Sequence, residues 1–245
     1  MPFRPRRLFI QVSSLIVKGL CRLLGGFRAE GLEHLPESGA AILASNHLSW
    51  ADPPAIRAVV RRSCWFMAND FLFRIPLLGR LIPLWGGFPV TRGRVDREAL
   101  KQAETHLKAG DLLCVFPEGG TSLSGKLVPF EGGVALLALR ADVPIIPVAL
   151  TGTDKVLPIT KMYPHFARGG VTLRMGPPLH PADIDPSLPR RERVDRLTER
   201  LHAAIAALLP PDYLPDDLLD TRPDAPPPVR LATQDAAGGA EPRVS

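Results

Sequence analysis

The feature that most constrains the fold is an alternation of short apolar runs with segments of helical periodicity between residues 27 and 209. Short runs bounded by Gly or Pro predict strands, whereas apolar residues three or four positions apart predict helices. Strands are predicted at 27–32, 40–44, 64–68, 86–90, 112–116, 144–150 and 171–175. Helices are predicted at 53–61, 97–109, 133–140 and 191–209. This order predicts a single α/β domain with a mixed, mostly parallel central sheet flanked by helices.

The 245-residue chain is long enough to bury a full core, and we expect three parts. An N-terminal amphipathic helix is predicted over residues 1–25, and the folded domain over 26–211. Residues 212–245 are predicted to be a disordered tail, because Pro, Asp, Ala and Gly dominate there and offer little to a core.

The N-terminal segment 6–25 carries an apolar face interrupted by polar and basic side chains. Its longest uncharged run, residues 8–17, is too short to cross a bilayer as a helix. The basic start resembles a twin-arginine signal, but Lys18 and Arg22 interrupt the apolar region and no Ala-x-Ala-like cleavage site follows promptly. A helix packed inside the domain stays an alternative. We favour an amphipathic helix in the plane of a membrane interface.

The charge of the chain is unevenly distributed, although its net value is only +5. Residues 1–30 hold six basic side chains against one acid, and residues 210–245 hold seven acids against three arginines. A basic, apolar start favours an anionic membrane surface at least as much as a nucleic acid. Nucleic-acid binding ranks last, because the arginines are not interleaved with aromatic residues on one element. Membrane lipids are expected partners, with the chain peripheral or monotopic at the cytoplasmic face.

The three cysteines, Cys21, Cys64 and Cys114, lie in apolar segments at spacings unlike those of metal sites. We expect reduced core thiols, as in a cytosolic setting. Neither a reactive thiol nor a crosslink is supported by the sequence.

The most specific local motif is the heptapeptide Asn46–Asp52, NHLSWAD, which lies between a predicted strand and a helix expected from Pro53. Asp52 is predicted to be the N-cap of that helix. His47 then lies in a turn after a strand, where α/β proteins usually hold their chemistry. A carboxylate on one ring nitrogen would leave the other to accept a hydroxyl proton, so we predict His47 as a general base oriented by Asp52. A helix cap only, and a buried core histidine, are the plainer alternatives.

Three further segments suit an anionic or apolar ligand. Residues 116–122 form a Gly-rich turn after a strand, whose backbone N–H groups and hydroxyls can hold an anion. Arg92 ends another predicted strand and can bind phosphate through two hydrogen bonds. The strand 144–150 is core, or a wall against an apolar ligand. A P-loop over 120–126 is rejected, because Leu127 occupies the position that requires Ser or Thr.

Taken in order, NHLSWAD, GGFPVTR, FPEGGTS and VPIIPVAL resemble the four blocks of the glycerolipid acyltransferases, the 1-acyl-glycerol-3-phosphate acyltransferase family. The resemblance covers about residues 25–180. It implies transfer of a fatty acyl group from acyl-CoA or acyl carrier protein to the free hydroxyl of a lysophospholipid, without a cofactor. It implies His47 as base and Asp52 as its orienting carboxylate. The residues expected to bind substrate are Asn46, Ser49, Arg92, Glu118, Gly119, Gly120, Thr121 and Pro147.

One departure from the family pattern concerns the acceptor. The third block commonly runs Phe-Pro-Glu-Gly-Thr-Arg, whereas Gly120 and Thr121 stand in its last two positions here. A phosphate-binding arginine is therefore missing at Thr121, and Arg92, Arg94 or Lys126 are candidates to replace it. The expected acceptor is 1-acyl-glycerol-3-phosphate, and a lyso-ornithine lipid or another lysolipid stays open.

Two rival functions remain from the sequence. A hydrolase would use Ser49 or Ser122 as nucleophile with His47 as base. A non-catalytic membrane or lipid-binding module would carry the histidine motif without using it.

Overall fold

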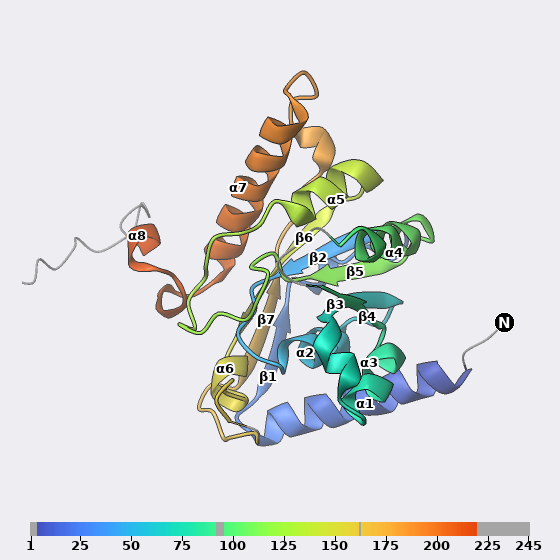
Figure 1. Ribbon diagram of the computed structural model, residues 1–245. Helices are drawn as coiled ribbons and strands as arrows, with labels where there is room; N and C mark the ends of the chain where they lie inside the picture. Colours follow the sequence, from blue (N-terminus) through green and yellow to red (C-terminus); the bar gives the residue numbers. More distant parts are fainter. Residues whose placement is uncertain (1–3, 92–95, 162, 220–245) are drawn as a thin grey trace, which may run out of the picture. The chain divides into compact units, whose positions relative to one another are not determined.

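The computed structural model describes residues 4–91, 96–161 and 163–219 (Figure 1). Met1–Leu214 belong to one compact unit, and the short helix α8 (Asp216–Leu219) belongs to a separate one. Whereas composition predicts disorder from Asp212, the 3-10 turn η4 (Pro211–Tyr213) and Leu214 belong to the compact unit, with Tyr213 and Leu214 buried. The folded domain thus ends at Leu214, three residues beyond the predicted boundary at 211, because the side chains of Tyr213 and Leu214 are buried in it.

The described residues form a seven-stranded sheet in the order β1-β7-β6-β2-β5-β3-β4. Every pair of neighbours is parallel except β6 and β7, which are antiparallel. The mixed, mostly parallel sheet predicted from the sequence is confirmed. The strands are β1 (Phe27–Glu30), β2 (Ala41–Ser45), β3 (Cys64–Asn69), β4 (Gly87–Val90), β5 (Leu112–Val115), β6 (Ile145–Thr151) and β7 (Val171–Met175).

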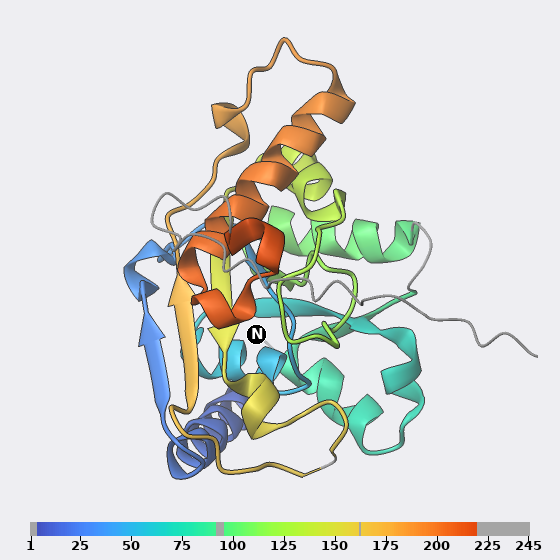
Figure 2. The same cartoon turned by 90° about the vertical axis from the view of Figure 1, so that its left-hand side faces the viewer.

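Helices cover both faces of the sheet (Figures 1 and 2). One face carries α1 (Arg4–Leu23), α2 (Asp52–Val59) and α3 (Leu78–Trp85). The other carries α4 (Arg97–Lys108), α5 (Gly133–Ala141) and α7 (Arg190–Leu208). Short elements complete the unit: α6 (Thr153–Val156) and the 3-10 turns η1 (Leu32–His34), η2 (Asp70–Arg74) and η3 (Pro181–Asp183). The sequence did not predict α3 or α6 as helices.

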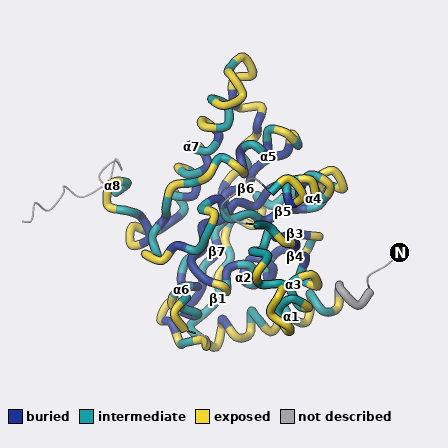
Figure 3. Tube along the Cα trace, viewed as in Figure 1, coloured by how far each residue is buried: buried dark blue, intermediate teal, exposed yellow. Residues whose placement is uncertain are grey.

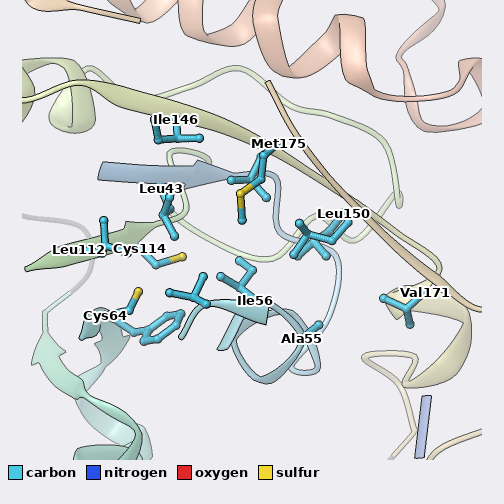
Figure 4. Close-up of a cluster of buried hydrophobic side chains, with 14 of the residues drawn as sticks. Leu43, Ala55, Ile56, Cys64, Leu112, Cys114, Ile146, Leu150, Val171 and Met175 are labelled. Carbon is cyan, nitrogen blue, oxygen red and sulfur yellow. The ribbon is translucent and has the colours of Figure 1, made fainter. Parts of the chain in front are cut away.

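The core lies on the central strands, where helices exclude water from both faces (Figure 3). All five residues of β2 are buried, and β5 and β6 are nearly as deep. Strands covered on two sides carry continuous apolar runs, which explains why these strands were recognisable in the sequence. Leu43 and Ile56 pack together with Cys64 and Cys114 in this core (Figure 4).

The three cysteines are buried and free of disulfides, as the sequence predicts. Burial raises the pKa of the Cys64 thiol to about 12 and that of the Cys114 thiol well above its ordinary value. These thiols therefore stay protonated and pack as small apolar groups.

The N-terminal helix α1 is docked on the domain by one face only. Ser14 Oγ donates to the carbonyl of Arg57 in α2 at 3.3 Å, and Trp85 Nε1 of α3 donates to Ser13 Oγ at 2.8 Å. Cys21 is buried on the same side. The opposite side, called here the outer face of α1, is exposed and comprises Leu8, Val12, Leu15, Ile16, Leu20 and Leu23. Across the described residues, no helix combines the length and hydrophobicity that a membrane span requires.

Candidate active site

The turn between β2 and α2 brings His47 and Asp52 into direct contact. His47 Nδ1 and Asp52 Oδ2 are 2.7 Å apart, and the Asp52 side chain is fully buried. The same carboxylate oxygen accepts the backbone N–H of Leu48 at 2.6 Å and that of Ser49 at 2.8 Å. Asp52 Oδ2 is therefore the common hydrogen-bond acceptor for the imidazole ring and for the backbone of the turn.

Asp52 reaches this position from inside the helix rather than from its cap. The N-cap of α2 is Ala51, Asp52 is the first helical residue, and Pro53 follows it. The N-cap role predicted for Asp52 is therefore wrong. Its side chain turns back to the N–H groups of the preceding loop, which have no other partner there, instead of capping the first turn of its own helix.

The second ring nitrogen of His47, Nε2, is not engaged by the contact with Asp52. Because Nδ1 donates to the carboxylate, Nε2 is the acceptor nitrogen of the neutral ring. Among the described residues no hydrogen bond to Nε2 is found, and the side chain keeps 11% of its surface exposed. The ring stacks on Phe116, with centroids 4.0 Å apart and planes at 20°. The imidazole is thus fixed in orientation and open at one edge, as a general base requires.

Asn46 and Ser49, which were expected to bind substrate, use their polar groups inside the protein. The Asn46 amide donates to the carbonyl of Leu150 at 2.9 Å and accepts its N–H at 2.7 Å, which extends the pairing of β2 with β6 by one step. Ser49 Oγ donates to the carbonyl of Leu157 at 2.6 Å and accepts the N–H of Ala51. Both side chains are buried, so their observed contacts hold the turn in place.

The Gly-rich segment after β5 lies against the same turn. The backbone N–H of Ser122 donates to the carbonyl of His47 at 2.8 Å, and Ser122 Oγ donates to the carbonyl of Lys126 at 2.7 Å. Gly119 has a φ of 69°, and a Cβ there would lie 2.8 Å from Glu131 Oε1, so the sharp bend requires glycine. Gly120 and Thr121 follow it and are half-buried.

Glu118 is the most perturbed acid of the site. Its two oxygens are buried, and neither has a hydrogen-bond partner among the described residues. Burial raises the pKa of the Glu118 carboxyl to about 8, and the nearby Asp52 adds to the rise, while a polar contact with the His47 backbone offsets part of it. At neutral pH Glu118 therefore carries a proton, and it can both donate and accept a hydrogen bond beside His47.

Of three other candidate residues, one lies in the sheet and two lie outside the described chain. Pro147 is buried in β6, beside Ala44 of β2, and its carbonyl accepts the N–H of Gly176. It is a residue of the sheet interior, and its expected role at an acyl site stays a prediction. Arg92 and Arg94 lie outside the described residues.

The comparisons with known proteins give the family. A family model described as "Acyltransferase" matches residues 26–151, which include the His47 turn, the Glu118 loop and the six strands from β1 to β6. The chain belongs to the acyltransferase family. The family resemblance found in the sequence is thereby confirmed, and the matched residues can be called the acyltransferase region.

Two relatives of this chain are both named 1-acyl-sn-glycerol-3-phosphate acyltransferase. The chain is 32% identical over 159 residues to a chloroplast 1-acyl-sn-glycerol-3-phosphate acyltransferase of Arabidopsis thaliana, covering 64% of this chain and 44% of that protein. It is 30% identical over 188 residues to the human 1-acyl-sn-glycerol-3-phosphate acyltransferase alpha, covering 72% of this chain and 65% of that protein. The chain thus spans about half the length of its plant relatives.

A solved structure extends the likeness to the fold. The crystal structure of the 1-acyl-sn-glycerophosphate acyltransferase PlsC of Thermotoga maritima aligns with a TM-score of 0.68 at 27% identity. The alignment covers 85% of this chain and 83% of that one. The α/β architecture of the acyltransferase region therefore has a direct counterpart among known structures.

Tyr213 is a residue near the site that the sequence did not reveal. Its hydroxyl accepts the N–H of Gly152 at 2.9 Å and donates to Asp154 Oδ1 at 3.2 Å, while its carbonyl accepts the N–H of Leu127 at 2.8 Å. Burial raises the pKa of this phenol to about 12, so the hydroxyl keeps its proton. Tyr213 therefore ties the Glu118 loop to the turn after β6. The sequence offers one signal for it: Tyr213 and Leu214 are two large side chains that favour burial within a stretch rich in Pro and Asp.

We predict that Tyr213→Phe lowers the free energy of unfolding by about 1–3 kcal/mol, because the buried N–H of Gly152 loses its acceptor. Urea unfolding followed by circular dichroism measures the change. The matched control is Tyr163→Phe, whose phenol is 61% exposed and which should leave stability unchanged. Equal losses in both variants would contradict the bridging role.

We predict a pH-dependent difference between wild type and Glu118→Gln. The folded state binds the Glu118 proton more tightly than the unfolded chain, because its pKa rises from 4.5 to about 8. As pH increases from about 4.5 to about 8, wild type should therefore lose stability relative to the variant, by at most about 1.4 kcal/mol per pH unit. Unfolding free energies at several pH values test this, with the exposed acid in Glu33→Gln as control. Parallel pH curves for wild type and Glu118→Gln would contradict it.

Proposed function

We propose that this chain transfers a fatty acyl group from acyl-CoA or acyl carrier protein to the free hydroxyl of a lysophospholipid. The acceptor most consistent with the relatives is 1-acyl-glycerol-3-phosphate, whose acylation gives phosphatidic acid. The observation that carries the proposal is the 2.7 Å contact between His47 Nδ1 and Asp52 Oδ2, inside a region that matches the acyltransferase family.

In this proposal His47 acts as the general base. Nε2 accepts the proton of the lysolipid hydroxyl while the hydroxyl oxygen attacks the thioester carbonyl carbon. A C–O bond forms, the C–S bond breaks, and the thiolate leaves with the proton that the imidazolium returns. The fully buried Asp52 carboxylate stabilises the imidazolium between these steps, since it lies in hydrogen-bond contact with Nδ1. No acyl-enzyme intermediate is needed.

The neutral Glu118 supports this chemistry from the facing loop. A protonated carboxyl can hydrogen-bond a polar group of the acceptor without adding negative charge beside a phosphate. An ionised glutamate at the same place would repel an anionic lysolipid. We therefore assign Glu118 to acceptor binding in its protonated form.

The serine contacts argue against the rival hydrolase. Ser49 Oγ donates its proton to the Leu157 carbonyl and Ser122 Oγ to the Lys126 carbonyl, so neither hydroxyl is directed at an imidazole nitrogen. A serine nucleophile needs its proton within reach of the base. Transfer without a serine ester is the simpler chemistry for this arrangement.

The acceptor headgroup has one alternative that a particular residue favours. Thr121 stands where the family commonly has arginine, so this loop offers a neutral side chain at a position expected to bind phosphate. A lyso-ornithine lipid or another lysolipid is therefore the second candidate acceptor. The two acceptors would differ in how the loop binds the headgroup, and the proposed role of His47 is the same for both.

We also propose peripheral attachment to the cytoplasmic face of a membrane through α1. Its outer face exposes six apolar side chains, whereas its polar Ser13 and Ser14 face α2 and α3. An apolar face turned to solvent beside Lys18 and Arg22 suits the interface of an anionic bilayer.

The catalytic proposal is tested by His47→Gln and Asp52→Asn, assayed on a panel of lysolipids with acyl-CoA and acyl carrier protein donors. Loss of the general base should lower turnover by about a hundredfold to ten-thousandfold. His34→Gln, in η1, is the matched control and should retain activity. Retained turnover in His47→Gln overturns the mechanism. Free fatty acid released without transfer supports a hydrolase, and no turnover on any lysolipid supports a lipid-binding module.

The attachment proposal is tested by Leu15→Asp, at a site that is 70% exposed on the outer face of α1. Sedimentation with vesicles of phosphatidylglycerol and phosphatidylcholine should show binding weakened by roughly tenfold to a hundredfold, since one buried leucine contributes about that factor. Binding equal to that of wild type would refute the role of this face.

A further inference from the structure

The crossover between β3 and β4 exposes apolar side chains that the acyltransferase chemistry does not use. It contains η2 and α3, and neither element has a buried residue. A crossover helix in an α/β protein normally buries an apolar stripe against the sheet. Here four large apolar side chains face solvent and are called the α3 ridge: Phe71, Ile75, Leu77 and Leu84.

The helix α3, which carries part of the α3 ridge, packs against α1. Trp85, at the end of α3, donates from Nε1 to Ser13 Oγ at 2.8 Å, and its ring lies 6.2 Å from that of Phe9. The two helices lie side by side in Figure 1. The docked faces of α1 and α3 thus contact each other, and each helix keeps a separate set of apolar side chains exposed.

The charges around the α3 ridge are predominantly positive. The helices α1 and α3 contain no Asp or Glu, and the one acid of η2, Asp70, pairs with Arg74 at 3.4 Å. Lys18, Arg22 and Arg80 add basic groups to the two helices. An apolar surface with a cationic surround complements anionic lipid headgroups better than it complements a protein surface of mixed charge.

The ridge also lies at the edge of the sheet that carries the chemistry. His47 follows the carboxyl end of β2, and η2 follows the carboxyl end of β3. Both strands run parallel to β5, which lies between them. A surface seated on η2 and α3 therefore brings the His47 edge of the sheet toward lipids, where a lysolipid acceptor resides.

We propose that the α3 ridge is a second lipid-contacting element, which works with α1 to seat the carboxyl edge of the sheet on an anionic bilayer. The proposal rests on the membrane attachment proposed above and adds a second point of contact. Attachment by α1 alone would leave the domain free to roll about the helix axis. Contacts on two adjoining helices fix the orientation of the site toward the membrane.

The test uses the full chain and vesicles of equal parts phosphatidylglycerol and phosphatidylcholine, with pure phosphatidylcholine vesicles for comparison. Leu77→Asp changes a residue that is 71% exposed and that occupies the N-cap position of α3, where Asp is favoured, so the helix start is preserved. Affinity for the mixed vesicles should fall by roughly tenfold to a hundredfold. Leu84→Asp, on the same ridge, should act in the same direction.

The matched control is Leu32→Asp, which changes an exposed leucine of η1. η1 follows β1, which runs parallel to β7 and therefore opposite to β6, so Leu32 lies toward the other edge of the sheet. This variant should bind the mixed vesicles within about twofold of wild type, since a single surface change away from the contact has little effect. Unfolding curves of all variants confirm that the fold is retained.

Vesicle binding of Leu77→Asp equal to that of wild type overturns the proposal. So does a result in which Leu77→Asp abolishes self-association in sedimentation velocity while vesicle binding persists, because the ridge would then contact a second copy of the chain. His47→Gln should bind vesicles as wild type does. Suppose that wild type acylates no lysolipid but binds vesicles, and that Leu77→Asp weakens this binding. The catalytic proposal then fails and the docking proposal stands.

Discussion

The buried carboxylate of Asp52 is the interaction on which the site depends. A single oxygen accepts the imidazole N–H and two backbone N–H groups of the β2–α2 turn. The bonds that shape the turn are therefore also the bonds that orient the histidine. A buried carboxylate is costly unless such donors surround it, so the turn and the charge stabilise each other. The orientation of the His47 ring is therefore a consequence of how the turn folds.

The turn is held from outside by segments far away in the chain. Asn46 bonds to Leu150, Ser49 bonds to Leu157, and the carbonyl of His47 accepts the N–H of Ser122. These partners come from β6, the segment after α6 and the Gly-rich loop, and Tyr213 connects that loop to the turn after β6. Among the described residues, Asp52 Oδ1 is the one buried side-chain oxygen or nitrogen of the turn without a hydrogen-bond partner. The His47 ring, by contrast, has no hydrogen bond to Nε2 from the described residues, which is the property that the proposed general base needs.

The sequence predicted those parts that depend on local patterns. Buried parallel strands are continuous apolar runs, and the five-residue spacing of His47 and Asp52 suffices to pair them, so both predictions hold. The position of Asp52 inside α2 and the inward bonds of Asn46 depend on partners about 100 residues away or on backbone geometry, which no local pattern encodes. Tyr213 was missed for the same reason, since its surroundings in the chain resemble a tail. The α3 helix was missed because it buries no apolar stripe.

The two acids of the site differ because their surroundings differ. Asp52 Oδ2 accepts three N–H groups, from the His47 ring and from the backbone of Leu48 and Ser49. Burial favours the protonated form of Glu118, the charge of Asp52 adds to this, and the polar contact with the His47 backbone offsets only part of the rise in pKa. In the proposed mechanism, the protonated His47 ring would therefore meet one negative charge rather than two. A second ionised carboxylate would hold the proton on the imidazolium more tightly and would slow its return to the leaving thiolate. In the proposed mechanism, burial of Glu118 would thus help His47 to release the proton that it accepts.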